Sequence, residues 1–193
     1  EPYPSARVAS NPDVPASGLP GGVSVFASDG GNVADTVMVP TLWGSVYALN
    51  ARDGTNQNGT DPLFKFTTDF HPIGAPVTIY RDQTDQRIKA LVATGGFTDS
   101  LSPTSTLWAP DGVNQYAVSF PITDNASVPI LDTDVLADSS LGLYIDLGKG
   151  NRAFSQATII GNEVFLTTDS SDVNSSLFGA TNTGTLFRIG IAT

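Results

Sequence analysis

The feature that most constrains this fold is a β-type segment that recurs three times at nearly equal spacing. Each copy starts with a turn residue and continues as an alternating strand around a central aromatic, at residues 44–49, 114–119 and 184–189. The central aromatics, Tyr47, Tyr116 and Phe187, stand 69 and 71 residues apart. A second hydrophobic strand precedes each copy, at residues 37–39, 90–93 and 164–166. Three such units predict propeller blades with long insertions, because typical blades contain about 40–50 residues.

Composition also favours strands and turns over helices. Of the 19 acidic residues only Glu1 and Glu163 are Glu, and all the others are Asp. Asp favours turns, whereas Glu favours helix interiors. The chain has 19 Gly and 13 Pro, and no window of eleven residues carries a helical stripe. Strands are predicted at residues 23–27, 36–39, 45–49, 63–67, 77–80, 88–94, 116–120, 143–147, 153–160, 164–168 and 185–189. The expected fold is all-β, a partial β-propeller of about three four-stranded blades with long inter-strand loops.

The expected organisation is a proline-rich lead-in followed by the propeller segment. Residues 1–22 hold five Pro and little periodicity, which is typical of an extended linker. The segment 23–193 then divides into blades at roughly 23–70, 76–122 and 142–190. Propellers need about 4–8 blades to close, so three do not make a ring. A second polypeptide, or an upstream part of the propeller, is therefore expected to complete it.

Charge and rare residues exclude several classes of protein. The net charge of −10 on 193 residues argues against nucleic acid as a partner. With no Cys and a single His, the chain has no disulfide framework, thiolate zinc site or multi-histidine metal site. No apolar run approaches the length of about 18 residues that a membrane span requires.

Four segments carry a family resemblance, in the same order along the chain. Residues 37–50, VMVPTLWGSVYALN, resemble a strand–turn–strand of quinoprotein-like propellers, and more specifically of the C-terminal propeller in PilY-type proteins of type IV pili. Residues 62–77, 93–106 and 142–168 resemble three further motifs of that propeller. The chain departs from the family pattern within the first of these segments, where Pro40 and Thr41 replace the family's Gly-Asp pair.

This resemblance implies a function outside the cell. PilY-type proteins are large and secreted, and their C-terminal propeller docks at the pilus tip. The chain is thus expected to be a non-enzymatic, extracellular or cell-surface segment acting in tip docking, pilus assembly or adhesion. Its partners would be pilin or other filament proteins. Two alternatives remain open: a piece of a secreted quinoprotein-like or glycan-active enzyme, which a bound chromophore would indicate, and a structural subunit of a surface filament.

The resemblance also points to a degenerate calcium loop. Family propellers carry a DxDxDGxxD loop, and residues 27–35 match it only at Asp29 and Asp35, with Ala27 and Gly31 at the first and fifth positions. Calcium takes six to eight oxygen ligands, so the expectation is either no cofactor or calcium at Asp29 and Asp35. No catalytic residue is predicted, because His71 stands before Pro72 without a G-x-S-x-G elbow.

Two further acidic regions are candidates for cation binding. Residues 53–61 place Asp53, Thr55, Gln57 and Asp61 at alternate positions, but DG and NG are also turn dipeptides. Residues 90–148 contain seven Asp and no Lys or Arg, including a cluster at 132–138. One interpretation of this stretch is a negative surface that attracts divalent cations or a basic partner. The alternative is a solvated loop face. Glycosylation sequons occur in predicted loops at Asn58, Asn125 and Asn174.

Overall fold

The computed structural model describes residues 22–28, 30–42, 44–66, 71–95, 114–122, 130–131, 143–149, 151–153, 155–170 and 183–191. Within those ranges every regular element is a strand, so the predicted all-β class is confirmed. None of the described residues forms a helix long and apolar enough to cross a membrane. The strands are β1 (Ser24–Phe26), β2 (Thr36–Pro40), β3 (Ser45–Asn50), β4 (Phe64–Phe66), β5 (Thr78–Arg81), β6 (Ile88–Ala93), β7 (Asn114–Pro121), β8 (Ile130–Leu131), β9 (Tyr144–Lys149), β10 (Asn151–Arg152), β11 (Thr158–Ile160), β12 (Glu163–Ser170) and β13 (Thr183–Gly190).

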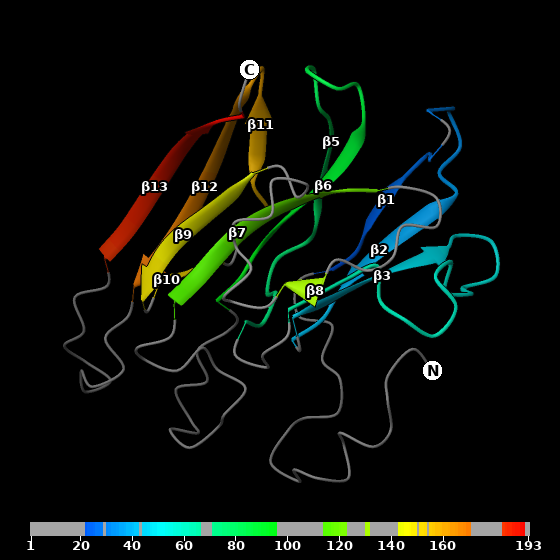
Figure 1. The fold of residues 1–193 in the computed structure, drawn as a ribbon, viewed down its shortest axis with the longest axis horizontal. Coiled ribbons are helices and arrows are strands. Elements are labelled where there is room, and N and C mark those ends of the chain that lie inside the picture. Colours follow the sequence, from blue (N-terminus) through cyan, green and yellow to red (C-terminus); the bar gives the residue numbers. More distant parts are fainter. Residues whose placement is uncertain are drawn as a thin grey trace, which may run out of the picture.

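These strands form three sheets that lie side by side (Figure 1). The first sheet has the order β1-β2-β3-β4-β8, and the second has the order β5-β6-β7-β9. In the third sheet β12 pairs with β10 and β11, and with β13 along its full length. All pairs are antiparallel except that of β4 with the two-residue β8. The fold is therefore a partial propeller-like array of β-sheets.

The recurrent sequence segment occupies the same place in every sheet. The strands around Tyr47, Tyr116 and Phe187 are β3, β7 and β13. Each pairs antiparallel with the hydrophobic strand that precedes it, namely β2, β6 and β12. The spacing of about 70 residues thus reports a repeated structural unit.

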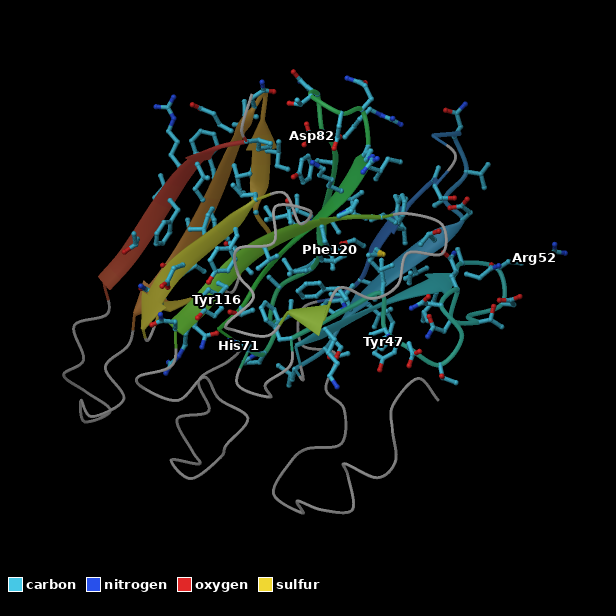
Figure 2. All side chains as sticks on the ribbon, in the orientation of Figure 1. Tyr47, Arg52, His71, Asp82, Tyr116 and Phe120 are labelled. Carbon is cyan, nitrogen blue, oxygen red and sulfur yellow. The ribbon has the colours of Figure 1, made fainter. Side chains whose placement is uncertain are left out.

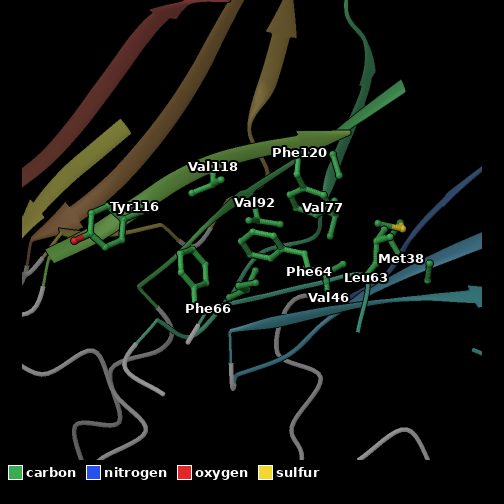
Figure 3. Packing of buried hydrophobic residues seen from close by; sticks show 13 residues of the cluster. Met38, Val46, Leu63, Phe64, Phe66, Val77, Val92, Tyr116, Val118 and Phe120 are labelled. Carbon is green, nitrogen blue, oxygen red and sulfur yellow. The ribbon is translucent and has the colours of Figure 1, made fainter. Parts of the chain in front are cut away.

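Two hydrophobic clusters fill the spaces between the sheets. In β6, Ala90 and Val92 face the first sheet, whereas Leu91 and Ala93 belong to the cluster shared with the third sheet. This alternation follows from the period of two in a strand, and it buries the central sheet on both faces. Figure 3 shows the cluster between the first and second sheets, where Phe64 stacks on Phe120 at a centroid distance of 4.4 Å. The apolar patterns of β6 and β7 therefore fix which sheets become neighbours.

Hydroxyl groups also join the sheets, at the edge strands β1, β5 and β11. The Ser24 Oγ at the start of β1 donates to the Val77 carbonyl oxygen, 2.5 Å away and directly before β5. The Thr78 Oγ1 at the start of β5 donates to the Ala157 carbonyl oxygen, 2.9 Å away and directly before β11. In both contacts, therefore, a hydroxyl at the start of one edge strand donates to the carbonyl directly before the edge strand of the next sheet.

Strand boundaries differ from the predicted ones in the third unit. The second sheet takes its fourth strand, β9, from beyond the predicted range 76–122, because β9 pairs with β7. Among the described residues of the strand predicted at 153–160, only those of β11 are in a strand, and β10 precedes the predicted range. Two described residues between β10 and β11 contact the second sheet: the Ala153 amide donates to the Thr94 carbonyl, and Gln156 Nε2 donates to the Val77 carbonyl.

Candidate interaction surfaces

The outward face of the third sheet is one candidate interaction surface. Strand alternation points Thr158 and Ile160 of β11 and Phe165 of β12 away from the second sheet, and Leu186 of β13 shares that face. Ile160 and Leu186 are each 64% exposed. A bidentate ion pair between Arg188 and Glu163, with N–O distances of 2.9 and 2.6 Å, borders them. This face combines exposed aliphatic side chains with a polar rim, as interaction sites do.

The outward face of the first sheet is the second candidate. Val25, Val37 and Leu49 are direct cross-strand partners and form an apolar row over β1, β2 and β3. Val25 is 60% exposed, whereas Val39 and Tyr47 on the same face are buried. The array thus presents apolar surface on both of its outer faces.

The two predicted calcium ligands do not both fall within the described residues. Asp29 lies outside them. The Asp35 carboxylate accepts hydrogen bonds from the Ser28 amide at 2.8 Å, the Ser28 hydroxyl at 2.6 Å and the Thr36 hydroxyl at 3.0 Å. These bonds, above all that of the Ser28 hydroxyl, lower the pKa of Asp35. Asp35 therefore closes the turn between β1 and β2, and a calcium ion would compete with its donors.

The other acidic regions are placed only in part. The Asp53 carboxylate accepts bonds from the Thr55 hydroxyl and amide, which lower its pKa and are typical of a turn. Gln57 donates instead to Thr36. Of the seven Asp in residues 90–148, all but Asp146 lie outside the described ranges, as do the sequon residues Asn125 and Asn174. Within those ranges no three acidic or histidine side chains gather to hold a metal ion.

The sequon at Asn58 lies within a turn of the described structure. The Asn58 side-chain nitrogen Nδ2 donates to the Pro62 carbonyl oxygen at 3.1 Å, and the Asn58 backbone amide donates to Asn56 Oδ1 at 3.2 Å. Nδ2, the atom to which a glycan would be attached, thus already donates a hydrogen bond within the turn.

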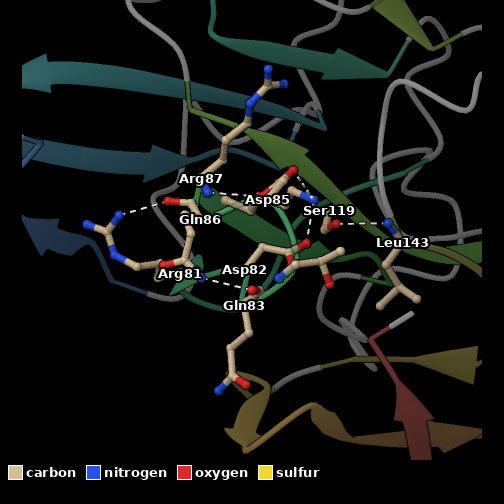
Figure 4. Close-up of polar contacts among 10 residues, drawn as sticks. Arg81, Asp82, Gln83, Asp85, Gln86, Arg87, Ser119 and Leu143 are labelled. Atoms are coloured by element: carbon tan, nitrogen blue, oxygen red, sulfur yellow. Dashed lines mark hydrogen bonds and ion pairs between the residues drawn. The ribbon is translucent and has the colours of Figure 1, made fainter. Parts of the chain in front are cut away.

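A compact charge cluster closes the hairpin between β5 and β6 (Figure 4). Lys89 Nζ lies 2.5 Å from Asp82 Oδ2 and 3.1 Å from Asp85 Oδ2. Asp82 is buried and also accepts the Thr84 amide. The Lys89 hydrogen bond, followed by that of Thr84, lowers the pKa of Asp82. The ammonium group already satisfies both carboxylates, so this acidic pair stabilises the hairpin.

Replacing Asp82 by alanine is expected to destabilise the protein by about 2 kcal/mol, because it removes the buried carboxylate that accepts from the Lys89 ammonium and the Thr84 amide and leaves Lys89 with the more exposed Asp85. Asp85→Ala is the matched control. Asp85 is more exposed, and its loss should cost less than about 1 kcal/mol. Urea denaturation of both variants measures the difference. Equal losses would show that burial of Asp82 does not matter.

Several polar side chains are buried in the region of His71 and Tyr116, which are labelled in Figure 2. Thr94, Gln115 and Arg152 are almost fully buried, and the Thr94 hydroxyl donates to Gln115 Oε1 at 2.7 Å. His71 is 2% exposed, with its ring centroid 4.9 Å from that of Phe66 and 5.2 Å from that of Tyr116. Burial lowers the pKa of His71 to about 4, although a hydrogen bond with Gln115 opposes the shift. His71 is thus a neutral packing residue at neutral pH.

This burial predicts a loss of stability in mild acid. The unfolded chain protonates His71 near pH 6.5, whereas the folded chain does so only near pH 4. The contribution of His71 to the free energy of unfolding is therefore fully present above pH 6.5, and about 3 kcal/mol of it is lost as the pH drops to 4. Urea denaturation from pH 7 to 4 measures this slope. His71→Gln should flatten it, and an unchanged slope in that variant would assign the acid sensitivity elsewhere.

The comparisons with known proteins include a structural likeness. No family model and no curated protein matches this sequence. Among solved structures, the C-terminal domain of PilY1 from Pseudomonas aeruginosa is similar, with a TM-score of 0.57 and 15% sequence identity. The match covers 77% of this chain and 44% of that one, so this chain spans less than half of the PilY1 domain. At this identity the likeness shows a PilY1-like fold.

Proposed function

We propose that this chain is a non-enzymatic, extracellular propeller segment of a pilus- or filament-associated protein, acting in tip docking, pilus assembly or adhesion. The observation that carries the proposal is the three-sheet array, which resembles the PilY1 C-terminal domain over 77% of this chain. The ordered motifs of the sequence, at residues 37–50, 62–77, 93–106 and 142–168, point independently to the same family.

The partners follow from the incomplete ring. The three sheets formed by the described residues fall short of the roughly 4–8 blades of a closed propeller, and both outer sheets expose valine, isoleucine or leucine. Further propeller sheets, from a second polypeptide or from another part of the same protein, would cover these faces. Pilin or other filament subunits would then bind the completed propeller.

Shearing of surface filaments from the source organism tests this function. The protein should sediment with the filaments, and deletion of the segment 23–193 should reduce filament number or adhesion. Re-expression of the intact gene should restore both. Retention of the protein inside the cell, or normal filaments and adhesion after deletion, would refute the proposal. A propeller that carried an enzyme cofactor instead would show an absorbance band in the purified protein.

A further inference from the structure

The edge strands β1, β5 and β11, one in each sheet, share a sequence pattern. Residues 23–26, 77–80 and 157–160 read VSVF, VTIY and ATII, so each of these strands begins with a Ser or Thr between apolar residues. Ser24 and Thr78 each donate to the carbonyl that directly precedes the corresponding edge strand of the next sheet. Thr158 is the third member of this series. Its side chain is exposed and has no hydrogen bond to any described residue.

Burial along these strands follows the presence of a neighbouring sheet. Two residues after each hydroxyl, Phe26 and Tyr80 pack into the cluster shared with the following sheet, but Ile160 is 64% exposed. The middle residues Ile79 and Ile159 pack toward the preceding sheet.

Their equivalent in the first sheet is Val25. It has no preceding sheet among the described residues, and it is 60% exposed. The exposed members of the pattern are therefore the ones at the two open ends of the array.

The two open ends are complementary to one another. The third sheet offers an exposed hydroxyl at Thr158 and an exposed aliphatic at Ile160. The first sheet offers Val23, directly before its first strand and 48% exposed, and the apolar side chain of Val25. Val23 and Val25 correspond in position to Val77 and Ile79, the residues with which the second sheet receives the first.

We propose that the third sheet of one copy docks on the first sheet of a second copy, with Thr158 Oγ1 donating to the partner's Val23 carbonyl. Two such head-to-tail contacts would join two copies into a ring of six sheets, within the range of about 4–8 that propellers use. This inference rests on the proposed propeller function and names the polypeptide that completes the ring. It also covers Ile160, Leu186 and Val25, the exposed aliphatics of both faces.

Cysteine crosslinking tests the contact directly, because the chain contains no Cys. A mixture of the Val23→Cys and Thr158→Cys variants should form a disulfide-linked dimer on oxidation, whereas each variant alone should not. Thr158→Cys mixed with Thr60→Cys, at an exposed turn position, is the control. Crosslinking no stronger than in this control would overturn the proposal.

Sedimentation of the unmodified chain tests closure of the ring. A dimer is expected at high protein concentration. A monomer at every concentration, or a ladder of longer oligomers, would overturn the closed ring. Val25→Lys and Ile160→Lys should each dissociate the dimer without lowering the melting temperature of the dilute monomer, since both side chains are exposed in the isolated chain. Val33→Lys, at a 78% exposed site in the β1–β2 connection, should leave it intact.

The hydroxyl itself is tested by conservative substitution. Thr158→Val should weaken dimerisation roughly 25-fold, because the closed dimer contains two of these neutral hydrogen bonds and each is worth about fivefold. Thr158→Ser should preserve it, because serine already fills this role at Ser24. Equal affinities for all three proteins would remove the hydroxyl from the contact. A monomeric chain that still sediments with filaments would refute this inference and leave the proposed function standing, and a dimer absent from filaments would do the reverse.

Discussion

Replacing Gly95 by alanine is expected to detach the third sheet from the second, with a loss of more than about 3 kcal/mol. Gly95 follows β6 and has a φ of +138°, a region that side chains rarely adopt. A Cβ at this position would lie 2.4 Å from the Arg152 Cα and 2.8 Å from the Ala153 nitrogen. Both atoms belong to the backbone, so rotation of a side chain cannot relieve the clash.

The neighbouring contacts explain why this clash would separate the sheets. The Gly95 amide donates to the Pro72 carbonyl, and the Ala153 amide donates to the Thr94 carbonyl. An outward shift of Ala153 would break the second bond and open the cluster in which Ala153 packs with Leu91 and Leu166. Urea denaturation measures the total loss. Hydrogen exchange should show that β12 and β13 lose protection before β2 and β3 do.

Gly54→Ala separates the clash from the cost of backbone conformation. Gly54 also has a positive φ, of +73°, but no atom lies within 4 Å of a Cβ built there. This control should cost about 1–2 kcal/mol, the price of the left-handed conformation alone. If Gly95→Ala costs no more than Gly54→Ala, the close approach of the two sheets does not limit stability.

The sequence predicts the strands well because their signal is local. Alternating apolar residues and turn residues mark β2, β3, β6 and β12 without knowledge of their neighbours. The spacing of Tyr47, Tyr116 and Phe187 also identifies corresponding strands in the three sheets. The two-residue strands β8 and β10 escape detection, because so short a segment has no periodicity.

The inter-sheet contacts are harder to predict, because they depend on residues far apart in the sequence. The role of Ser24 becomes visible only when the Val77 carbonyl, 53 residues away, is seen beside it. A signal was nevertheless present in the VSVF, VTIY and ATII segments at residues 23–26, 77–80 and 157–160. The acidic motifs illustrate the opposite limit. Asp53 and Gln57 stand at alternate positions, as ligands of one cation could. In the structure, however, Asp53 accepts a hydrogen bond from Thr55 and Gln57 donates one to Thr36, so the two side chains serve different contacts.

Replacing Phe64 by alanine is expected to destabilise the protein by about 3–5 kcal/mol. Phe64 is fully buried in the first sheet. Its ring stacks on Phe120 of the second sheet at an interplanar angle of 5° and meets the edge of Phe66 at a centroid distance of 5.0 Å. The substitution removes the transfer energy of a buried ring and leaves a cavity between two sheets that Ser24 and Val77 also hold together.

Phe165→Ala is the matched control for the same chemical change. Phe165 lies on the outward face of the third sheet and is only half-buried, so its loss from the isolated chain should cost less than about 1.5 kcal/mol. Phe64→Ala should lower the urea midpoint at an unchanged m-value and reduce the melting temperature by roughly 10 °C. If the two variants lose equal stability, the first and second sheets do not share one cooperative core. If Phe165→Ala costs more stability in the dimer than in the isolated chain, the outward face of the third sheet is buried in the assembly, as the proposed contact at its cross-strand partner Thr158 requires.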